Sequence, residues 1–212
     1  MEPDRSRWRR RKQTETGREP KVMDNKQLLM QCAKELFYAK GYDAVGVQEI
    51  VDRAGLTKPT LYYYFGSKIG LLKTLLDTKF SEFREFMKRF VRSDERIEDV
   101  LYGLATAYFD FFEQDREFYM LMMALFYSAR ENEAYQAVKP YVTEFYELVV
   151  QVFESASYQL GNMNGRQRQF AIGFIGTINH YLLLQCEVNP GQRTDRAQIA
   201  ALMKQFMYGI FS

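Results

Sequence analysis

The amino-acid sequence predicts an all-α protein, and three observations lead to this. Apolar residues recur at three- and four-residue spacing from about residue 24 to residue 210, which is the period of helices buried on one side. No segment alternates apolar and polar residues over the length of a strand. Hydrophobic residues make up 47% of the 212 residues, which is ample for a helical core.

Caps and breakers divide the pattern into separate helices. Asp24 and Gln27 have the spacing of a capping box, and Gly41 is placed to end the first helix. A helix of about 25 residues that starts at Ser67 would be about 37 Å long, enough to connect two modules. Beyond the first 66 residues we expect helices over residues 67–92, 96–112, 116–130, 133–158, 166–186 and 194–210, with Pro140 kinking or dividing the fourth of these and Thr194 capping the last.

The most informative stretch is GVQEIVDRAGLTKPTLYYYFGSK, residues 46–68. Gly55 stands where the end of a helix favours a residue with positive φ, and Thr57 is a good N-cap for a second helix. Leu61 and Phe65 are four residues apart, so they lie on one face and can pack on the first helix. The stretch therefore predicts a helix-turn-helix.

The outward face of the second helix is aromatic, rich in hydroxyl groups and flanked by lysines. Hydroxyls can reach phosphates and base edges, tyrosine rings can touch thymine methyl groups, and lysines suit phosphate. The alternative is a buried helix pair with tyrosines in the core, but such a pair would seldom expose this many hydroxyls. The predicted DNA-contacting residues are Thr57, Lys58, Pro59, Thr60, Tyr62, Tyr63 and Lys68.

At this point the chain resembles a known family. The residues from Leu28 to Leu72 are similar to the DNA-binding domain of TetR-family transcriptional regulators. The resemblance is carried by Gly41-Tyr42, Ile50, Ala54-Gly55-Leu56, Leu61-Tyr62, Phe65 and Ser67-Lys68. It implies a homodimeric regulator with a variable, all-helical C-terminal domain that binds a small-molecule effector.

One departure from the family pattern concerns the first helix of the motif. The family usually has Thr or Ser near the start of this helix, whereas Gly46 and Val47 stand there in this chain. Backbone N–H groups or the side chain of Gln48 are then left to contact phosphate, so Gln48 joins the predicted DNA-binding residues.

Charge and resemblance together divide the chain into three segments. Residues 1–22 contain RSRWRRRK and few apolar residues, so we expect a disordered basic arm that lies along DNA or an extension of no consequence. Residues 23–72 are expected to form the helix-turn-helix domain. Residues 73–212 carry a slight acidic excess and are expected to form a helical effector-binding and dimerisation domain.

The middle of this C-terminal segment is unusually rich in methionine and aromatic residues. For any one of these residues the plain interpretation is packing in a helical core. Such side chains also adapt to irregular apolar ligands, and a few polar groups among them could orient one. The predicted effector-binding residues are Tyr108, Phe112, Met123, Tyr127, Tyr146, Asn179 and His180.

The last two helices are the expected dimer contacts. The helix over residues 166–186 is apolar nearly all round through its middle, so we expect it to be buried on more than one side. Gly173 and Gly176 would allow another helix to approach closely. The alternative is that both helices only complete the core of one chain.

Several function classes are excluded by what the sequence lacks. Two cysteines and one histidine make no disulfide framework or metal-ligand spacing, so we expect no metal. No Gly-rich phosphate loop or nucleophile–base pair is recognisable, so we expect neither a cofactor nor an enzyme. No signal peptide and no apolar run of about 20 residues is present, which predicts a cytoplasmic protein without membrane contact.

The leading hypothesis is a dimeric, sequence-specific regulator that binds a palindromic double-stranded operator, with one recognition helix in the major groove of each half-site. It would be a repressor released by a small, largely apolar effector. The alternative is an activator, or a ligand-independent regulator, of the same fold.

Overall fold

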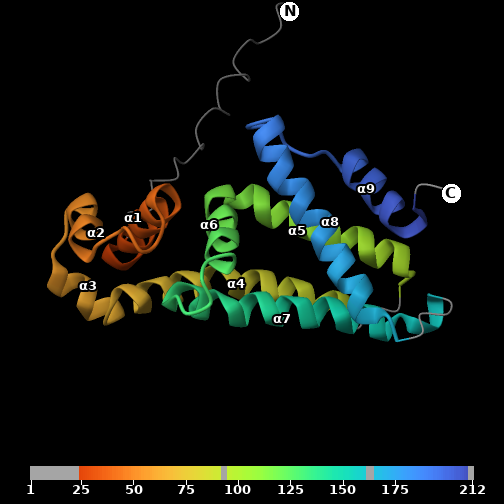
Figure 1. Cartoon of the computed structure of the whole chain (residues 1–212), viewed down its shortest axis with the longest axis horizontal. Coiled ribbons are helices and arrows are strands. Elements are labelled where there is room, and N and C mark those ends of the chain that lie inside the picture. The colour runs from red at the N-terminus through yellow and green to blue at the C-terminus, as the bar shows by residue number, and fades with distance from the viewer. Residues whose placement is uncertain (1–23, 92–94, 161–164, 210–212) are drawn as a thin grey trace, which may run out of the picture.

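The computed structural model describes residues 24–91, 95–160 and 165–209, and the predicted basic arm lies outside this range (Figure 1). The described residues form α-helices and one short 3-10 helix, so the all-α class is confirmed. The elements are α1 (Asn25–Lys40), α2 (Val47–Ala54), α3 (Lys58–Phe65), α4 (Lys68–Val91), α5 (Ile97–Gln114), α6 (Arg116–Phe126), α7 (Glu133–Ser155), η1 (Ser157–Gln159), α8 (Gln167–Val188) and α9 (Arg196–Tyr208).

Helices α1, α2 and α3 form the predicted helix-turn-helix domain. The Asp24 side chain caps α1 by accepting from the backbone N–H of Gln27 at 2.7 Å. Gly55 ends α2 in the left-handed conformation, with φ of 64°, which a residue without Cβ adopts freely. Leu61 and Phe65 are buried between α3 and its neighbours, as their four-residue spacing predicts.

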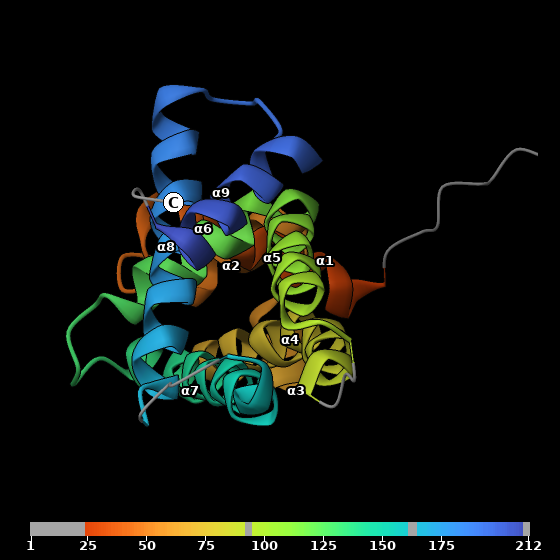
Figure 2. The ribbon, with the colours of Figure 1, turned by 90° about the vertical axis from the view of Figure 1, so that its right-hand side faces the viewer.

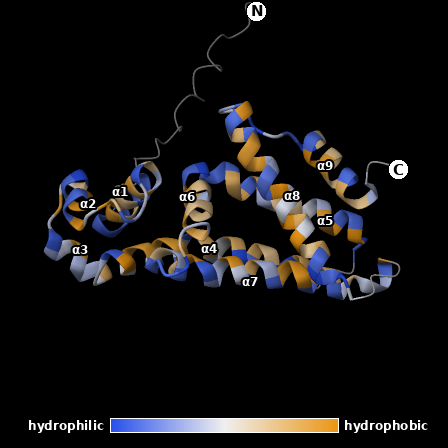
Figure 3. Cartoon of the chain, viewed as in Figure 1, coloured by the Kyte–Doolittle hydropathy of each residue, from blue (hydrophilic) through white to orange (hydrophobic). Residues whose placement is uncertain are grey.

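The larger part of the molecule is arranged around α4 and α7, which lie side by side. Figure 2 shows these two helices as a base, with α8 rising on one side, α5 on the other and α6 between them. Hydrophobic residues line the sides on which these helices face one another (Figure 3). Because α4 continues directly from the helix-turn-helix domain, it joins the two parts of the molecule, as the sequence predicts.

Helix α8 buries one face within this chain, and burial of a second face against another copy stays a prediction. Ala171, Phe174, Ile178 and Leu182 are buried in the core. Apolar side chains on its other faces remain accessible, and these are Ile172 at 61%, Leu184 at 62% and Val188 at 71% exposure.

The structure differs from the sequence prediction at several helix ends and at Pro140. Helix α6 ends at Phe126 instead of residue 130, since the chain turns there before the side chain of Asn132 caps α7. Helix α7 continues unbroken through Pro140, which lies on the exposed side where water can bind the carbonyl that loses its partner. The N-cap of α9 is Asp195, which forms a complete capping box with Gln198.

The junction between α3 and α4 depends on Gly70, where a Cβ atom would lie 2.0 Å from the carbonyl oxygen of Phe65. We expect Gly70→Ala to lower the free energy of unfolding by about 1–3 kcal/mol, because backbone must move to relieve the clash. Denaturant unfolding measures this. Gly103→Ala is the matched control: its new Cβ would meet the movable ring of Phe90, and the gain in helix propensity offsets that contact. If the two substitutions lower the free energy of unfolding equally, the α3–α4 junction does not depend on Gly70.

Candidate functional site

The outward face of α3 is the first candidate site. Tyr63 is 82% exposed and Tyr62 is 48% exposed, while Leu61 and Phe65 turn into the domain. Lys58 and Pro59 are also exposed at the start of the helix. A short helix that presents aromatic rings and hydroxyls outward, with its opposite face fully packed, has the form of a recognition helix.

The two threonines at the start of α3 lie on this surface and contact each other. Their hydroxyl oxygens are 3.0 Å apart. Thr57 holds the N-cap position, as the sequence predicts, but its side chain makes no capping hydrogen bond. The N–H groups of the first turn of α3 are therefore not covered by that hydroxyl and remain suited to an anion.

Lys68 is placed differently from the prediction that it contacts DNA backbone. Its ammonium group donates to the carbonyl oxygens of Tyr42 and Val45, both at 3.0 Å, and lies 4.1 Å from the centre of the Tyr42 ring. Two of its three N–H groups are thus used within the domain. Lys68 holds the loop between α1 and α2 against α4, a contact between residues distant in sequence.

Gln48, which was predicted to contact phosphate, is exposed near the start of α2. Its side-chain amide donates to the carboxylate of Asp52 at 2.6 Å, one helical turn further on. This contact lies on the surface, where a competing phosphate oxygen could replace the carboxylate.

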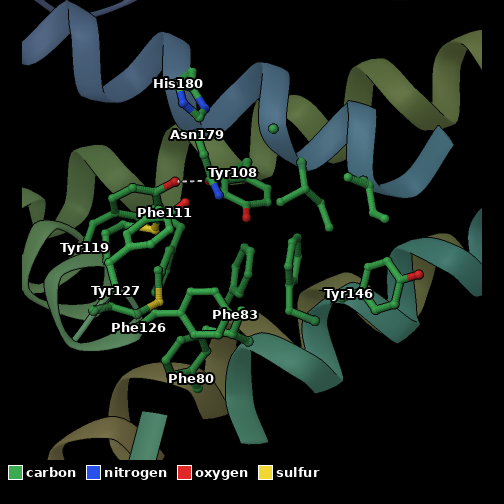
Figure 4. A pocket seen from close by; sticks show the side chains of 17 residues that line it. Phe80, Phe83, Tyr108, Phe111, Tyr119, Phe126, Tyr127, Tyr146, Asn179 and His180 are labelled. Carbon is green, nitrogen blue, oxygen red and sulfur yellow. Dashed lines mark hydrogen bonds between the residues drawn. The ribbon is translucent and has the colours of Figure 1, made fainter. Parts of the chain in front are cut away.

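The second candidate site is a cavity of about 310 Å³ in the larger part of the molecule, lined mainly by aromatic side chains (Figure 4). Helices α4, α5, α6, α7 and α8 all contribute to its wall. The lining residues are Phe80, Phe83, Tyr108, Phe111, Tyr119, Met122, Met123, Phe126, Tyr127, Val142, Phe145, Tyr146, Ile172, Ile175, Gly176, Asn179 and His180. The list contains Tyr108, Met123, Tyr127, Tyr146, Asn179 and His180, which were predicted from sequence.

Phe112, the remaining predicted residue, is not part of the cavity wall. Its ring is buried against Tyr119, with centroids 5.2 Å apart, and beneath the guanidinium of Arg116. The preceding residue, Phe111, faces the cavity instead and stacks on Phe83 at 4.3 Å. Adjacent residues of a helix point about 100° apart, so the sequence could not decide which of the two faces inward.

Sequence reasoning also missed Phe80 and Phe83, which α4 contributes to the cavity. Both belong to the apolar stripe of that helix, and nothing in the stripe separates core from cavity. Phe80 stacks on Tyr141 at 5.0 Å, and Phe83 stacks on Phe145 at 5.4 Å. These contacts show that α4 and α7 share one layer of aromatic rings beneath the cavity.

The polar groups of the cavity are few and uncharged. Tyr119 donates its hydroxyl hydrogen to the side-chain oxygen of Asn179 at 2.5 Å. Burial raises the pKa of Tyr119 well above its ordinary value, and it raises that of Tyr108 as well. Phenols of ordinary pKa are already protonated near neutral pH, so both hydroxyls can donate there.

A partly buried ionic cluster joins the helix-turn-helix domain to the start of α6. Asp115 caps α6 by accepting from the N–H of Phe118 at 3.1 Å. The same carboxylate accepts from Lys34 of α1 at 2.8 Å and from Lys79 of α4 at 2.5 Å, and Lys34 also contacts Glu117 at 3.3 Å. Burial by itself raises the pKa of Asp115, but the hydrogen bonds from the two lysines outweigh burial, so its pKa lies below the ordinary value.

A second polar link lies beyond the other end of α6. The Tyr42 hydroxyl, from the loop after α1, donates to Glu133 at the start of α7 at 2.6 Å. In the same region Asn132 donates to Asp43 at 2.6 Å. The helix-turn-helix domain is thus linked to the start of α6 through Asp115 and to the start of α7 through Asn132 and Glu133.

The described residues contain neither a metal-binding cluster nor a membrane-spanning helix. No group of three or more His, Cys, Asp or Glu side chains that could hold a metal ion occurs in the part of the chain that the structure describes. No described helix is long and apolar enough to cross a membrane.

The fold and the α3 surface define a helical DNA-binding regulator, and comparisons with known proteins give its family. A sequence model of "Bacterial regulatory proteins, tetR family" matches residues 29–75. The chain is 32% identical over 147 residues to the transcriptional activator FasR of Mycolicibacterium smegmatis, covering 69% of this chain and 65% of FasR. It is 50% identical over 46 residues to the repressor BdcR of Escherichia coli, covering 22% of this chain and 23% of BdcR. The chain thus spans less than two thirds of each of these relatives.

Solved structures agree on the fold. FadR from Bacillus subtilis, in complex with stearoyl-CoA, has a TM-score of 0.73 at 18% identity, covering 86% of this chain and 98% of FadR. AibR, in complex with isovaleryl coenzyme A and operator DNA, has a TM-score of 0.67 at 18% identity, covering 89% of this chain and all of AibR. This chain belongs to the TetR family of transcriptional regulators. The relatives named here are regulators of transcription, and none is described as an enzyme.

The recognition face generates a prediction about DNA binding. Tyr63→Ala should weaken binding to a duplex selected from a random-sequence pool by about 1–3 kcal/mol, because the most exposed ring of α3 is lost while the domain core stays intact. Fluorescence anisotropy of labelled duplex measures this. The matched control is Tyr158→Ala, which removes a tyrosine of η1 that is 74% exposed. Unchanged binding by a folded Tyr63→Ala protein would remove Tyr63 from the interface.

Proposed function

We propose that this protein is a ligand-controlled transcriptional regulator that binds a palindromic operator as a homodimer. One α3 helix would lie in the major groove of each half-site, with Pro59, Thr60, Tyr62 and Tyr63 toward the bases. Thr57, Lys58 and Gln48 would contact the DNA backbone. The observation that carries this proposal is the exposed, hydroxyl-rich face of α3, in a domain that is tied to a ligand-sized cavity.

The proposed effector is small and largely apolar. A cavity of about 310 Å³ is at the lower end of the range for ligand sites, and its walls are mainly aromatic and aliphatic. Two structures of the same fold contain coenzyme A thioesters, stearoyl-CoA in FadR and isovaleryl coenzyme A in AibR. We therefore propose that an acyl chain occupies the cavity of this protein. We also propose that the protein acts in the cytoplasm.

The proposed dimer uses the free faces of α8 and α9. Leu184 and Val188, one turn apart near the C-terminal end of α8, are 62% and 71% exposed, and Tyr208 of α9 is 53% exposed. Exposed apolar side chains of this kind favour association with another protein surface. Two copies that pair along these helices would place two α3 helices for a palindromic site.

Release of DNA by the effector is the simplest regulatory scheme, and it makes the protein a repressor. An effector that binds better to a conformer with misplaced α3 helices would lower operator affinity. Activation is the second candidate, because FasR, which is 32% identical, is an activator. Transcription measured in vitro from a selected operator, with and without effector, separates the two schemes.

Two helices carry the proposed coupling between cavity and DNA. Helix α4 contributes Phe80 and Phe83 to the cavity and continues into the helix-turn-helix domain. Helix α6 contributes Met122 and Met123 and is tied to Lys34 of α1 through Asp115. Packed helices shift as units, so a ligand that displaces either one would also move the recognition helix.

Filling the cavity should imitate or block the effector. Met123 is 5% exposed and lines the cavity, so Met123→Trp should either weaken operator binding without effector or remove the response to effector. The expected change in coupling is about 1–3 kcal/mol, measured by operator titrations with and without an acyl-CoA. Met120→Trp on the same helix, outside the cavity wall, is the control. If a folded Met123→Trp dimer binds and releases DNA normally, the effector site lies elsewhere.

The Asp115 cluster can be tested without disturbing the helix cap. Asp115→Asn keeps an N-cap side chain for α6 but removes the negative charge that holds Lys34 and Lys79. We expect effector-dependent release of DNA to weaken by about 1 kcal/mol or more, since the ionic link between the domains is lost. Asp195→Asn, at the N-cap of α9, is the matched control. Equal coupling in both variants would show that Asp115 only caps α6.

A further inference from the structure

Asn179 of α8 contributes an amide group to the described wall of the cavity. Its oxygen accepts from the Tyr119 hydroxyl at 2.5 Å, which orients the amide. No acceptor for its nitrogen occurs among the described residues. Figure 4 shows Asn179 reaching from α8 toward the cavity, beside Tyr108 and Tyr119.

The electrostatic character of the cavity narrows what this donor can bind. No Asp, Glu, Lys or Arg is among the described residues that line it. His180 is the one lining side chain that can become a cation, and it is exposed to solvent. A carboxylate buried beside Asn179 would therefore lack a counter-charge, and burial of an unpaired carboxylate is strongly unfavourable.

A neutral carbonyl group can be buried beside Asn179 without this cost. Its oxygen can accept from the amide nitrogen of Asn179, and it carries no charge that must be desolvated. The Tyr119 hydroxyl, protonated near neutral pH like any phenol, donates to the Asn179 oxygen and so turns the amide nitrogen away from Tyr119. The aromatic and aliphatic walls on either side suit the hydrocarbon chain.

We propose that the cavity recognises an apolar chain bearing a neutral carbonyl group, such as a thioester or ester, and rejects the free carboxylic acid, with Asn179 donating to the carbonyl oxygen. This inference rests on the proposed effector role of the cavity and adds the chemical class of the ligand and the residue that selects it. It differs from a site for fatty acids, which would need a buried Lys or Arg.

The test compares ligands of one chain length: the N-acetylcysteamine thioester, the methyl ester, the free acid and the alkane. Calorimetric titration of the full-length protein measures each affinity near neutral pH. We expect the free acid to bind on the order of a hundredfold more weakly than the thioester, since it must enter as the neutral acid or as an unpaired ion. The alkane, which has no oxygen, should bind about three- to tenfold more weakly than the ester.

Variants of the Tyr119–Asn179 pair identify the donor. Asn179→Leu alone would leave the Tyr119 hydroxyl buried without an acceptor and could affect folding, so the informative comparison uses Tyr119→Phe as background. Adding Asn179→Leu to Tyr119→Phe should lower thioester affinity about three- to tenfold and leave alkane affinity unchanged. Thermal unfolding confirms that both variants are folded.

Each other result overturns the inference in a recognisable way. If the free acid binds as tightly as the thioester and loses affinity in His180→Gln, the imidazole is the selecting group. If thioester affinity is the same in the unaltered protein and in the double variant, Asn179 is not the donor. If no ligand of the series binds while Met123→Trp still responds normally on DNA, the effector role of the cavity fails together with this inference.

Discussion

The structure depends on one carboxylate, that of Asp115, which meets Lys34 of α1 and Lys79 of α4 while it caps α6. Removing a carboxylate and an ammonium group from water is expensive, so such a cluster adds little net stability. Its value is directional, because breaking one partner leaves an unpaired buried charge. The cluster therefore fixes the helix-turn-helix domain in one orientation relative to the cavity, and a different orientation requires the charges to find new partners.

The cavity follows from the size and rigidity of the rings around it. Phe83 stacks on Phe111 at 4.3 Å and on Phe145 at 5.4 Å, so three helices meet through flat surfaces. Flat rings in fixed stacks cannot fill an irregular space as aliphatic side chains do. Met122 and Met123 on α6 supply the flexible part of the wall. The same rings that hold α4, α5 and α7 together thus leave room for a ligand beside α6.

The sequence predicted those features that depend on local spacing. The helix-turn-helix, Gly55 and the inward Leu61 and Phe65 were correct because caps and helical periodicity are local properties. The sequence also located the aromatic region, but it chose Phe112 where Phe111 faces the cavity. The internal role of Lys68 and the Asp115 cluster were not predictable, because each joins residues far apart in the chain and depends on tertiary packing.

The position of α6 limits how a ligand could act. Helix α6 forms part of the cavity wall and is held at its start to α1 and α4 by Asp115, whereas the bond from Tyr42 to Glu133 holds the start of α7. A ligand that pushes the start of α6 must therefore either carry α1 with it or break the contacts of Lys34 and Lys79 with Asp115, since neither contact has slack at hydrogen-bond distance. In the proposed scheme, this link makes α6 a second route from cavity to DNA beside the continuous helix α4.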